Sequence, residues 1–390
     1  MAGADTEVAV IGGGVVGCAV AHALARRGVR ATVIEAEREL ALGASGANSG
    51  ILHSGFDSTP GTLETRLILR SSQLREELVG ELGVEVWRCG ARLAANGERE
   101  RAAVLALAQN ARINGVAAQL EQDGSLEVPG ETLTDPVAFV CALAGAARAG
   151  GASIRLRARV TGLARAADRG LVVELEEGEL IHARAGVNCA GLYADELARM
   201  AGEELVSVYP RKGEFLVFAA PRDPPLEQIL LPVPTEMGKG VLVFPTLDRS
   251  AVIVGPTARE REDKRDWSVE ADAGELLLAK ARRSYPALEG LGPLGAYAGL
   301  RPAGRAGNYV IASSTTLPTL VHVAAIRSTG LSASLGIGEH VAALLADAGT
   351  ISLGPVRALA APACQTPAQT WWQRAASRSA GSTPSSPGAP

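Results

Sequence analysis

The sequence predicts an α/β fold, in which an amino-terminal βαβ unit starts a parallel sheet and a second, α+β domain is built on a mixed sheet. Two observations support the first part: a short β-branched strand runs into a glycine-rich turn, and an alanine-rich apolar helix follows it. The second part rests on a cluster of strand-like segments between residues 206 and 257. A chain of 390 residues is long enough for both parts.

The βαβ unit ends at Glu35. Its first strand is predicted at Glu7–Ile11 and its second strand at Val29–Glu35. The helix between them spans Val15–Arg27 and is apolar on nearly every face, as expected for a helix packed between a sheet and further protein. Gly28 ends this helix, because glycine readily adopts the left-handed conformation found after helix C-termini.

After this unit the regular alternation of strand and helix stops. A loop of small residues covers 43–50, and helices are predicted at 62–80, 98–114 and 135–149, the last one capped by Asp135. Strands are predicted at 152–164, 170–176 and 182–189. The second domain contains strands at 214–218, 240–244 and 251–254, and helices follow at 271–285 and 331–346.

Composition excludes several classes of protein. The 38 Lys and Arg against 42 Asp and Glu give a net charge of −4 without a basic stripe, so we expect no nucleic-acid partner. The five cysteines form no Cys-x-x-Cys pair, so we expect no disulfide framework, no metal site and a reduced, cytoplasmic setting. Met1–Glu7 lacks the basic region of a signal peptide, and we find no membrane span. Contact with the inner face of the membrane stays open.

The turn after the first strand predicts a dinucleotide site. Three glycines occupy the G-x-G-x-x-G spacing, namely Gly12, Gly14 and Gly17. The helix that begins at Val15 and Val16 offers free N–H groups to a diphosphate. Glu35 stands at the spacing of the acid that accepts hydrogen bonds from ribose hydroxyls. The alternative is a glycine-rich turn in an unrelated α/β fold.

The cofactor is predicted to be FAD rather than NAD. An NAD domain should continue as βαβαβ after Glu35, whereas this chain enters the small-residue loop at 43–50, which suits a segment lying along a flavin. Only one glycine fingerprint is present, and no redox pair of cysteines accompanies it. Both absences favour a flavin that an organic substrate reduces directly.

Eight further segments carry a family resemblance: residues 47–55, 60–63, 187–195, 210–215, 238–246, 255–257, 298–302 and 328–333. Through them the chain, from Glu7 to Leu345, resembles the D-amino-acid-oxidase (DAO) superfamily of FAD-dependent oxidoreductases. Within it, the chain is most similar to the branch of glycerol-3-phosphate oxidases and dehydrogenases and L-2-hydroxyglutarate dehydrogenases.

The sequence departs from this branch in three places. The segment at 118–132 is shorter than in relatives, and Ser328-Thr-Gly330 replaces the usual Ser-Pro-Gly. Longer relatives continue into a cysteine-rich iron–sulfur domain, but the tail of this chain contains only Cys364, so no cluster is expected.

The resemblance implies a glutathione-reductase-type FAD fold assembled from both ends of the chain. We assign residues 1–80, 151–203 and 291–352 to the Rossmann-like FAD domain and 204–290 to the substrate domain, with 81–150 as a helical segment of that domain. Residues 353–390 are rich in Ala, Pro, Ser and Gly and are predicted to be a disordered tail.

His53 and Arg301 are the candidate catalytic residues. Alcohol oxidation by hydride transfer needs a base, and neutral imidazole fits that role, which the resemblance also implies for His53. The Arg301 guanidinium offers a planar fork for an anionic group of the substrate. Lys264 and Ser328 complete the candidate substrate site. The alternatives are a histidine that only packs, a structural ion pair for the arginine and a solvated loop for the lysine.

The resemblance implies further contacts with FAD. The start of the last helix faces the flavin pyrimidine ring, where its positive end stabilises the reduced flavin; this start comprises Ser328, Thr329, Gly330 and Leu331. Val160 meets adenine through its backbone. The other candidates are Ala36, Ser45, Gly46, Asn48, Ser49, Cys189, Ala190 and Gly191. Tight packing is the alternative for these small-residue turns.

We therefore predict that the protein oxidises a CH–OH group, most plausibly converting sn-glycerol 3-phosphate to dihydroxyacetone phosphate. The alternatives are an L-2-hydroxyglutarate dehydrogenase, an amino-acid or amine oxidase of the same superfamily, and a non-catalytic flavin-binding scaffold. The electron acceptor, whether oxygen, a quinone or a protein, stays open.

Overall fold

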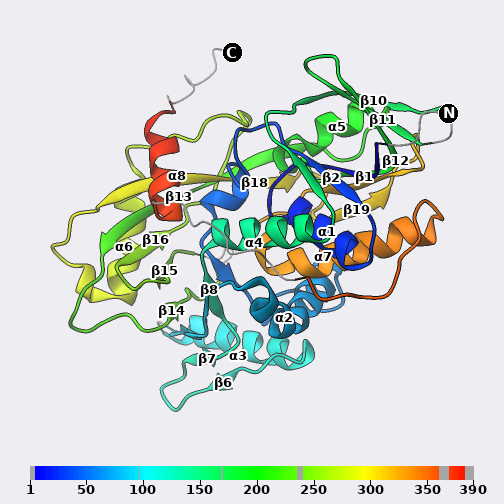
Figure 1. Cartoon of the computed structure of the whole chain (residues 1–390). Helices are drawn as coiled ribbons and strands as arrows, with labels where there is room; N and C mark the ends of the chain where they lie inside the picture. Colours follow the sequence, from blue (N-terminus) through cyan, green and yellow to red (C-terminus); the bar gives the residue numbers. More distant parts are fainter. Residues whose placement is uncertain (1–4, 96, 168–169, 235–239, 360–368, 383–390) are drawn as a thin grey trace.

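Two large sheets organise the chain in the computed structural model, which describes residues 5–95, 97–167, 170–234, 240–359 and 369–382 (Figure 1). In these ranges one sheet has eight strands, the other nine, and a small sheet of three strands accompanies them. Helices pack against both large sheets, so the predicted α/β class is confirmed.

The eight-stranded sheet contains the predicted βαβ unit. β1 (Thr6–Ile11) pairs in parallel with β2 (Ala31–Ile34) on one side and with β12 (Leu180–Asn188) on the other. β9 (Ser153–Arg155) lies beyond β2. The antiparallel β11 (Leu171–Leu175) and the parallel β20 (Leu320–Ala324) share the far edge of β12. β10 (Val160–Arg165) and β19 (Val310–Ser313) extend the sheet from these two strands.

A group of helices that includes α1 lies against one face of this sheet (Figure 1). α1 (Val15–Arg26) packs against α4 (Pro136–Ala149) and α7 (Gly330–Asp347), and α7 packs against α2 (Leu63–Leu82). Glycines in α7 allow this close approach: a Cβ at Gly336 would lie 2.4 Å from the carbonyl oxygen of Leu67, and one at Gly338 would lie 2.6 Å from that of Ala19. Larger side chains would push the helices apart.

The nine-stranded sheet is assembled from distant segments. Its order is β17 (Arg259–Glu260), β13 (Val208–Ala219), β16 (Ala251–Gly255), β15 (Leu242–Pro245), β14 (Ile229–Leu230), β5 (Ala91–Leu93), β7 (Leu126–Val128) and β6 (Gln119–Leu120). β18 (Gly295–Gly304) pairs with β13 along the whole of Val208–Val217. This differs from the predicted division, which assigned 291–352 to the FAD domain, because the long register with β13 places β18 in the second sheet.

The remaining elements connect the sheets. β3 (Ile51–Leu52), β8 (Thr132–Thr134) and β4 (Val86–Trp87) form the small sheet. α3 (Glu98–Ile113), α5 (Ala194–Met200) and α6 (Ala273–Ser284) lie on the outside, and the short helices are η1 (Ala44–Ala47), η2 (Gly191–Tyr193) and η3 (Pro286–Leu288).

The prediction of a disordered tail over 353–390 is wrong for the residues of α8 (Trp371–Ala380). Thr370 and Gln373 form a capping box at its start, and Trp371 and Trp372 are buried against the body of the protein. The low apolar content of the tail predicted disorder, but the two indole rings provide the apolar surface that holds the helix in place. α8, red in Figure 1, lies beside β18.

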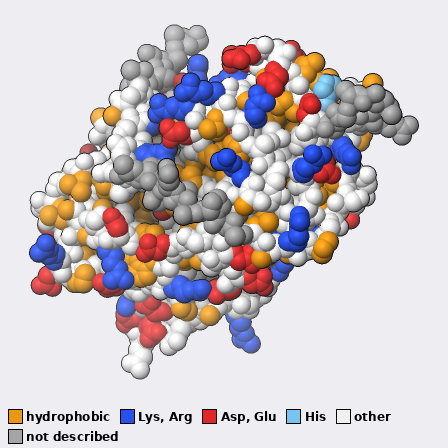
Figure 2. Space-filling model, viewed as in Figure 1, with side chains coloured by type: hydrophobic (Ala, Val, Ile, Leu, Met, Phe, Trp, Pro, Cys, Tyr) orange, Lys and Arg blue, Asp and Glu red, His pale blue; other side chains and the backbone are white. Residues whose placement is uncertain are grey.

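The surface agrees with the mixed composition. Figure 2 shows acidic and basic side chains interspersed over the face in view. Among the described residues, no helix is long and apolar enough to cross a membrane, and no group of three or more His, Cys, Asp or Glu side chains could hold a metal ion.

Candidate cofactor and substrate site

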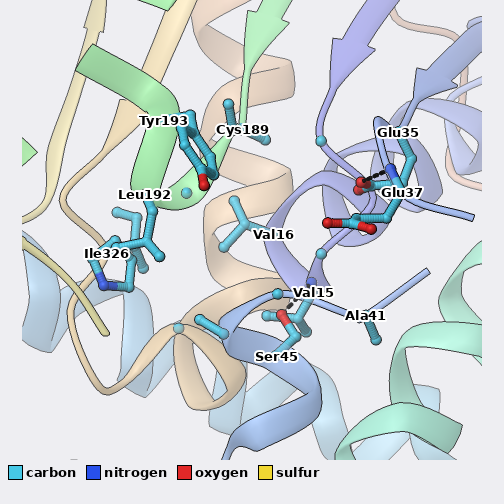
Figure 3. A pocket seen from close by; sticks show the side chains of 18 of the residues that line it. Val15, Val16, Glu35, Glu37, Ala41, Ser45, Cys189, Leu192, Tyr193 and Ile326 are labelled. Atoms are coloured by element: carbon cyan, nitrogen blue, oxygen red, sulfur yellow. Dashed lines mark hydrogen bonds between the residues drawn. The ribbon is translucent and has the colours of Figure 1, made fainter. Parts of the chain in front are cut away.

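A cavity runs over the carboxyl ends of β1, β2 and β12 and reaches the start of α7 (Figure 3). The predicted residues that line it are Gly12, Gly14, Val15, Val16, Glu35, Ala36, Ser45, Asn48, Val160, Cys189, Ala190, Gly191, Arg301, Ser328, Gly330 and Leu331. The tertiary fold therefore brings segments from residues 12 to 331 together around one space. The predicted residues outside this lining are Gly17, Gly46, Ser49, His53, Lys264 and Thr329.

Two glycines of the fingerprint shape the turn. Gly12 has a φ of +113°, and a Cβ there would lie 2.4 Å from the carbonyl oxygen of Cys189. A Cβ at Gly17 would lie 1.9 Å from the carbonyl oxygen of Gly12, so only glycine lets α1 begin this close to β1. Gly17 thus shapes the turn through packing, although it does not line the cavity itself.

The first turn of α1 offers unpaired donors to the cavity. The N–H of Val15 donates to Ser45 Oγ (2.9 Å), and the N–H of Gly13 donates to Glu35 Oε2 (2.6 Å). The N–H groups of Gly14, Val16 and Gly17 have no acceptor among the described residues. Such groups at a helix N-terminus bind phosphate, so this cradle fits the diphosphate of a dinucleotide.

Glu35 lies at the edge of the same cavity (Figure 3). Its Oε1 accepts the N–H of Glu37 (2.8 Å), while Oε2 holds the glycine turn through Gly13. Each carboxylate oxygen has a second lone pair that can accept a ribose hydroxyl. Glu35 therefore fixes the turn and remains able to bind a nucleoside.

The start of α7 forms the other end of the cavity. Ser328 has a φ of +63°, and the N–H groups of Gly330, Leu331 and Ser332 have no acceptor among the described residues. The partial positive charge of this helix terminus suits negative charge on a reduced flavin. The Thr329 hydroxyl instead points inward, where it donates to Glu64 Oε1 (2.6 Å).

Two other predicted cofactor residues have structural roles in the loop. A Cβ at Gly46 would lie 2.2 Å from the carbonyl oxygen of Ala41, so this glycine serves packing. Ser49 Oγ accepts the N–H of Ile51 (3.4 Å) within its own turn. The tight-packing alternative therefore describes both residues.

His53 is bound to a buried carboxylate. Its Nδ1 lies 2.7 Å from Oε2 of Glu131, whose side chain is 0% exposed. Glu131 Oε1 accepts both the N–H and the hydroxyl of Ser54, at 2.7 Å each. A carboxylate accepts hydrogen bonds, so Nδ1 carries the proton and Nε2 keeps a free lone pair.

The backbone of His53 is tied to the start of α7. Its N–H donates to Ser332 Oγ (2.8 Å), and its carbonyl oxygen accepts from Arg75 Nη2 (3.0 Å). These bonds hold the imidazole next to the helix whose first residues line the cavity. The sequence prediction missed Glu131, because several acids lie near it in the sequence and no local pattern distinguishes it from them.

Arg301 lines the cavity and is held by the backbone. Its Nε donates to the carbonyl oxygen of Arg211 (3.0 Å), and its Nη2 donates to those of Thr257 (2.9 Å) and Lys212 (3.3 Å). No carboxylate lies within 4.0 Å of it among the described residues. Burial, together with the charges of Arg211 and Arg327, lowers the pKa of Arg301 to about 10, so it stays charged at neutral pH.

Two further arginines, Arg211 and Arg327, lie close enough to Arg301 for their charges to act on it. Arg211 on β13 and Arg301 on β18 stand directly opposite each other in the strand register. Arg327 precedes the start of α7, and neither it nor Arg211 forms an ion pair among the described residues. The sequence prediction missed Arg211 and Arg327, although Arg211 lies within the segment 210–215 and Arg327 directly precedes the segment 328–333, both of which carried the family resemblance.

Lys264 is less suited to hold an anion. Its ammonium donates to Asp195 Oδ1 and Glu196 Oε1, both at 2.8 Å, so its charge is already balanced. This pairing does not favour the predicted substrate contact.

Taken together, the fold and the cavity define a dinucleotide-binding oxidoreductase whose cavity extends from the start of α1 to the start of α7. The family described as FAD dependent oxidoreductase (DAO) matches residues 7–344, and the chain belongs to this family. The DAO family is FAD-dependent, and the cradle at α1 fits that cofactor.

Individual relatives narrow the resemblance. The chain is 29% identical to a glycerol 3-phosphate dehydrogenase of Caloramator mitchellensis, over 87% of this chain and 73% of that protein. It is 29% identical to an L-2-hydroxyglutarate dehydrogenase of Escherichia coli, over 70% of this chain and 69% of that protein. Its fold matches the FAD-bound L-alpha-glycerophosphate oxidase of Mycoplasma pneumoniae with a TM-score of 0.84 and 27% identity, over 91% and 97% of the two chains.

Proposed function

We propose that the protein oxidises the secondary alcohol of sn-glycerol 3-phosphate to dihydroxyacetone phosphate. The observation that carries this proposal is the set of three arginines without carboxylate partners, Arg211, Arg301 and Arg327. Like charges directly opposite on paired strands are destabilising, and so are buried cations without a partner. A bound anion removes both costs, and a dianionic phosphoryl group does so better than one carboxylate.

The chain's own residues then divide the work. Arg301 orients the anionic end of the substrate, because its fork is already fixed by three carbonyl oxygens. His53 accepts the hydroxyl proton at Nε2, and Glu131 holds the ring and stabilises the imidazolium that results. Bound FAD would supply the acceptor for the hydride that leaves the substrate carbon. The relatives that act on glycerol 3-phosphate support the same substrate.

A second candidate substrate is L-2-hydroxyglutarate. The arginine group also fits a carboxylate, and relatives with that name match 70% of the chain. An amino-acid or amine substrate has less support, since a positively charged site repels an ammonium group.

Anaerobic titration of the yellow holoprotein tests the proposal. Glycerol 3-phosphate should bleach the flavin absorbance fully at the lowest concentration. Bleaching by L-2-hydroxyglutarate alone, or by an amino acid alone, would replace the proposed substrate, whereas glycerol without the phosphate should bleach the flavin poorly. The absence of bleaching by every compound would support the scaffold alternative.

A further inference from the structure

Helix α8 lies outside the part of the chain that matches the DAO family, since that match ends at residue 344 and α8 begins at Trp371. It nevertheless packs on β18 and on η1, the short helix that contains Ser45. Because Ser45 Oγ accepts the N–H of Val15, η1 borders the diphosphate cradle directly. Helix α8 therefore lies beside the cofactor cavity.

Specific contacts hold α8 there. Trp371 meets Tyr297 edge-on at 5.6 Å between ring centroids, and Tyr297 stacks on Phe215 at 4.7 Å. Ser379 Oγ accepts the N–H of Ala298 on β18 (2.9 Å), and Ser382 Oγ accepts the N–H of Trp267 (3.0 Å). The hydrogen bond to Ser379 also satisfies an N–H of β18. Among the described residues, β18 pairs with β13 alone.

One side chain of α8 reaches the cavity. Arg378 lines it beside Trp267, and its Cζ lies 3.8 Å from the centroid of that indole ring. Its Nη2 lies 4.0 Å from Oε1 of Glu37, at the limit of an ion pair. Its Nη1 is buried and has no hydrogen-bond partner among the described residues. Burial lowers the pKa of Arg378, and the nearby Glu37 offsets this only in part.

A buried donor without a partner is costly, and on the partly buried guanidinium of Arg378 it marks a place where an anion would fit. The cavity that Arg378 faces also contains the unpaired N–H groups of Gly14 and Val16. The backbone N–H groups and the guanidinium of Arg378 both favour a phosphate group, because the planar guanidinium matches the geometry of phosphate oxygens. Within FAD, the diphosphate is the anionic part.

We propose that Arg378 completes the cofactor site by binding the FAD diphosphate, so that α8 closes the cavity over the adenosine diphosphate half of the cofactor. Stacking of the Arg378 guanidinium on the Trp267 ring fixes the orientation of the guanidinium before FAD binds. This role does not depend on which substrate the enzyme oxidises, so it stands or fails separately from the proposed function.

FAD affinity of the apoprotein tests the role of Arg378. The dissociation constant should be measured from the quenching of flavin fluorescence for the wild type, Arg378→Ala and Arg378→Lys. We expect Arg378→Ala to weaken FAD binding roughly tenfold or more, since hydrogen bonds between charged groups contribute about 1.5–3 kcal/mol. Arg378→Lys should recover part of the affinity, because it keeps the charge but loses the fork.

Arg374→Ala is the matched control. Arg374 lies one turn earlier on α8 and pairs with Glu39 outside the cavity lining. Arg374→Ala should leave the FAD affinity within about twofold of the wild type. A loss of anchoring of α8 would instead weaken FAD binding in Arg374→Ala and Arg378→Ala alike. The affinity of Arg378→Ala should also depend less on salt than that of the wild type, because one phosphate contact is gone.

Equal losses of affinity in both alanine variants would overturn the proposal and reduce α8 to a structural element. An unchanged salt dependence in Arg378→Ala would also overturn it, because Arg378 would then contact a neutral part of FAD. If Arg378→Ala does not fold, Arg378→Gln, which also removes the charge but keeps more of the side chain, replaces it in the same two measurements beside the Arg374→Ala control.

Discussion

The imidazole of His53 and the carboxylate of Glu131 are joined by a 2.7 Å contact between Nδ1 and Oε2, and that carboxylate is fully shielded from solvent. Because Ser54 occupies Oε1 through two hydrogen bonds, Oε2 is left to accept the imidazole proton. The arrangement selects the tautomer in which Nε2 is a base.

Exchange of Glu131 for Gln should reverse that tautomer. The amide can donate to Nδ1, which would place the proton on Nε2 and remove the base. We expect the anaerobic rate of flavin reduction to fall roughly 100-fold, the range typical of a lost general base. His53→Asn should have an effect of similar size. Glu127→Gln, a neighbouring acid paired with Arg92 on the outside, is the control. Flavin reduction at the wild-type rate in His53→Asn would show that His53 is not the base.

Arg301→Lys should weaken substrate binding although it keeps the charge. Lysine cannot reproduce a fork held by the carbonyl oxygens of Arg211 and Thr257. The dissociation constant for glycerol 3-phosphate, measured by stopped-flow flavin reduction, should rise roughly tenfold to 100-fold, as expected for lost hydrogen bonds to a charged group. Arg305→Lys, at an exposed arginine that lies over the ring of Tyr209, should bind substrate normally. Equal binding by both variants would contradict the assignment.

Gly12→Ala should prevent stable binding of FAD. Its φ of +113° is unfavourable for alanine, and the new Cβ would lie 2.4 Å from the carbonyl oxygen of Cys189. We expect the purified variant to be colourless, as measured by the ratio of absorbance at 450 and 280 nm, which are the usual flavin and protein bands, at roughly a tenth or less of wild-type occupancy. Gly80→Ala is the control, since Gly80 lies within α2, outside the cavity lining, and nothing lies within 4 Å of the added Cβ. Full flavin content in Gly12→Ala would refute this account of the turn.

Glu203 should make folding sensitive to acid. Burial alone would raise its pKa, but hydrogen bonds from Ser314, Thr315 and His322 outweigh burial and lower the pKa from 4.5 to about 2. Since the folded-state pKa is the lower one, the stabilisation is complete above about pH 4.5 and is lost as the pH falls toward 2.

Urea unfolding of Glu203→Gln measures this contribution. At pH 7 the variant should be less stable than the wild type by roughly 2–3 kcal/mol, and the difference should shrink as the pH is lowered below 4.5. Glu204→Gln, at the exposed neighbouring position, should show no such difference. A stability gap that is the same at pH 7 and pH 3 would contradict the assignment.

The sequence by itself determined the βαβ unit, the FAD fingerprint and the family. Strand, turn, helix and acid follow one another within 35 residues, so local propensity and glycine spacing contain nearly all the information. Apart from Gly17 and Gly46, the predicted cofactor residues from Gly12 to Asn48 line the cavity, because they lie close together in the sequence.

Only the tertiary structure decided which side chains meet. Glu131 reaches His53 across 78 positions of the chain, and Arg211 faces Arg301 because the register of β13 and β18 aligns them. Helix α8 lies beside the cavity because Trp371 packs against Tyr297, a contact that no local sequence pattern predicts. Sequence periodicity specifies elements and faces, whereas partner choice depends on sheet register and on distant packing surfaces, which exist only after the chain has folded.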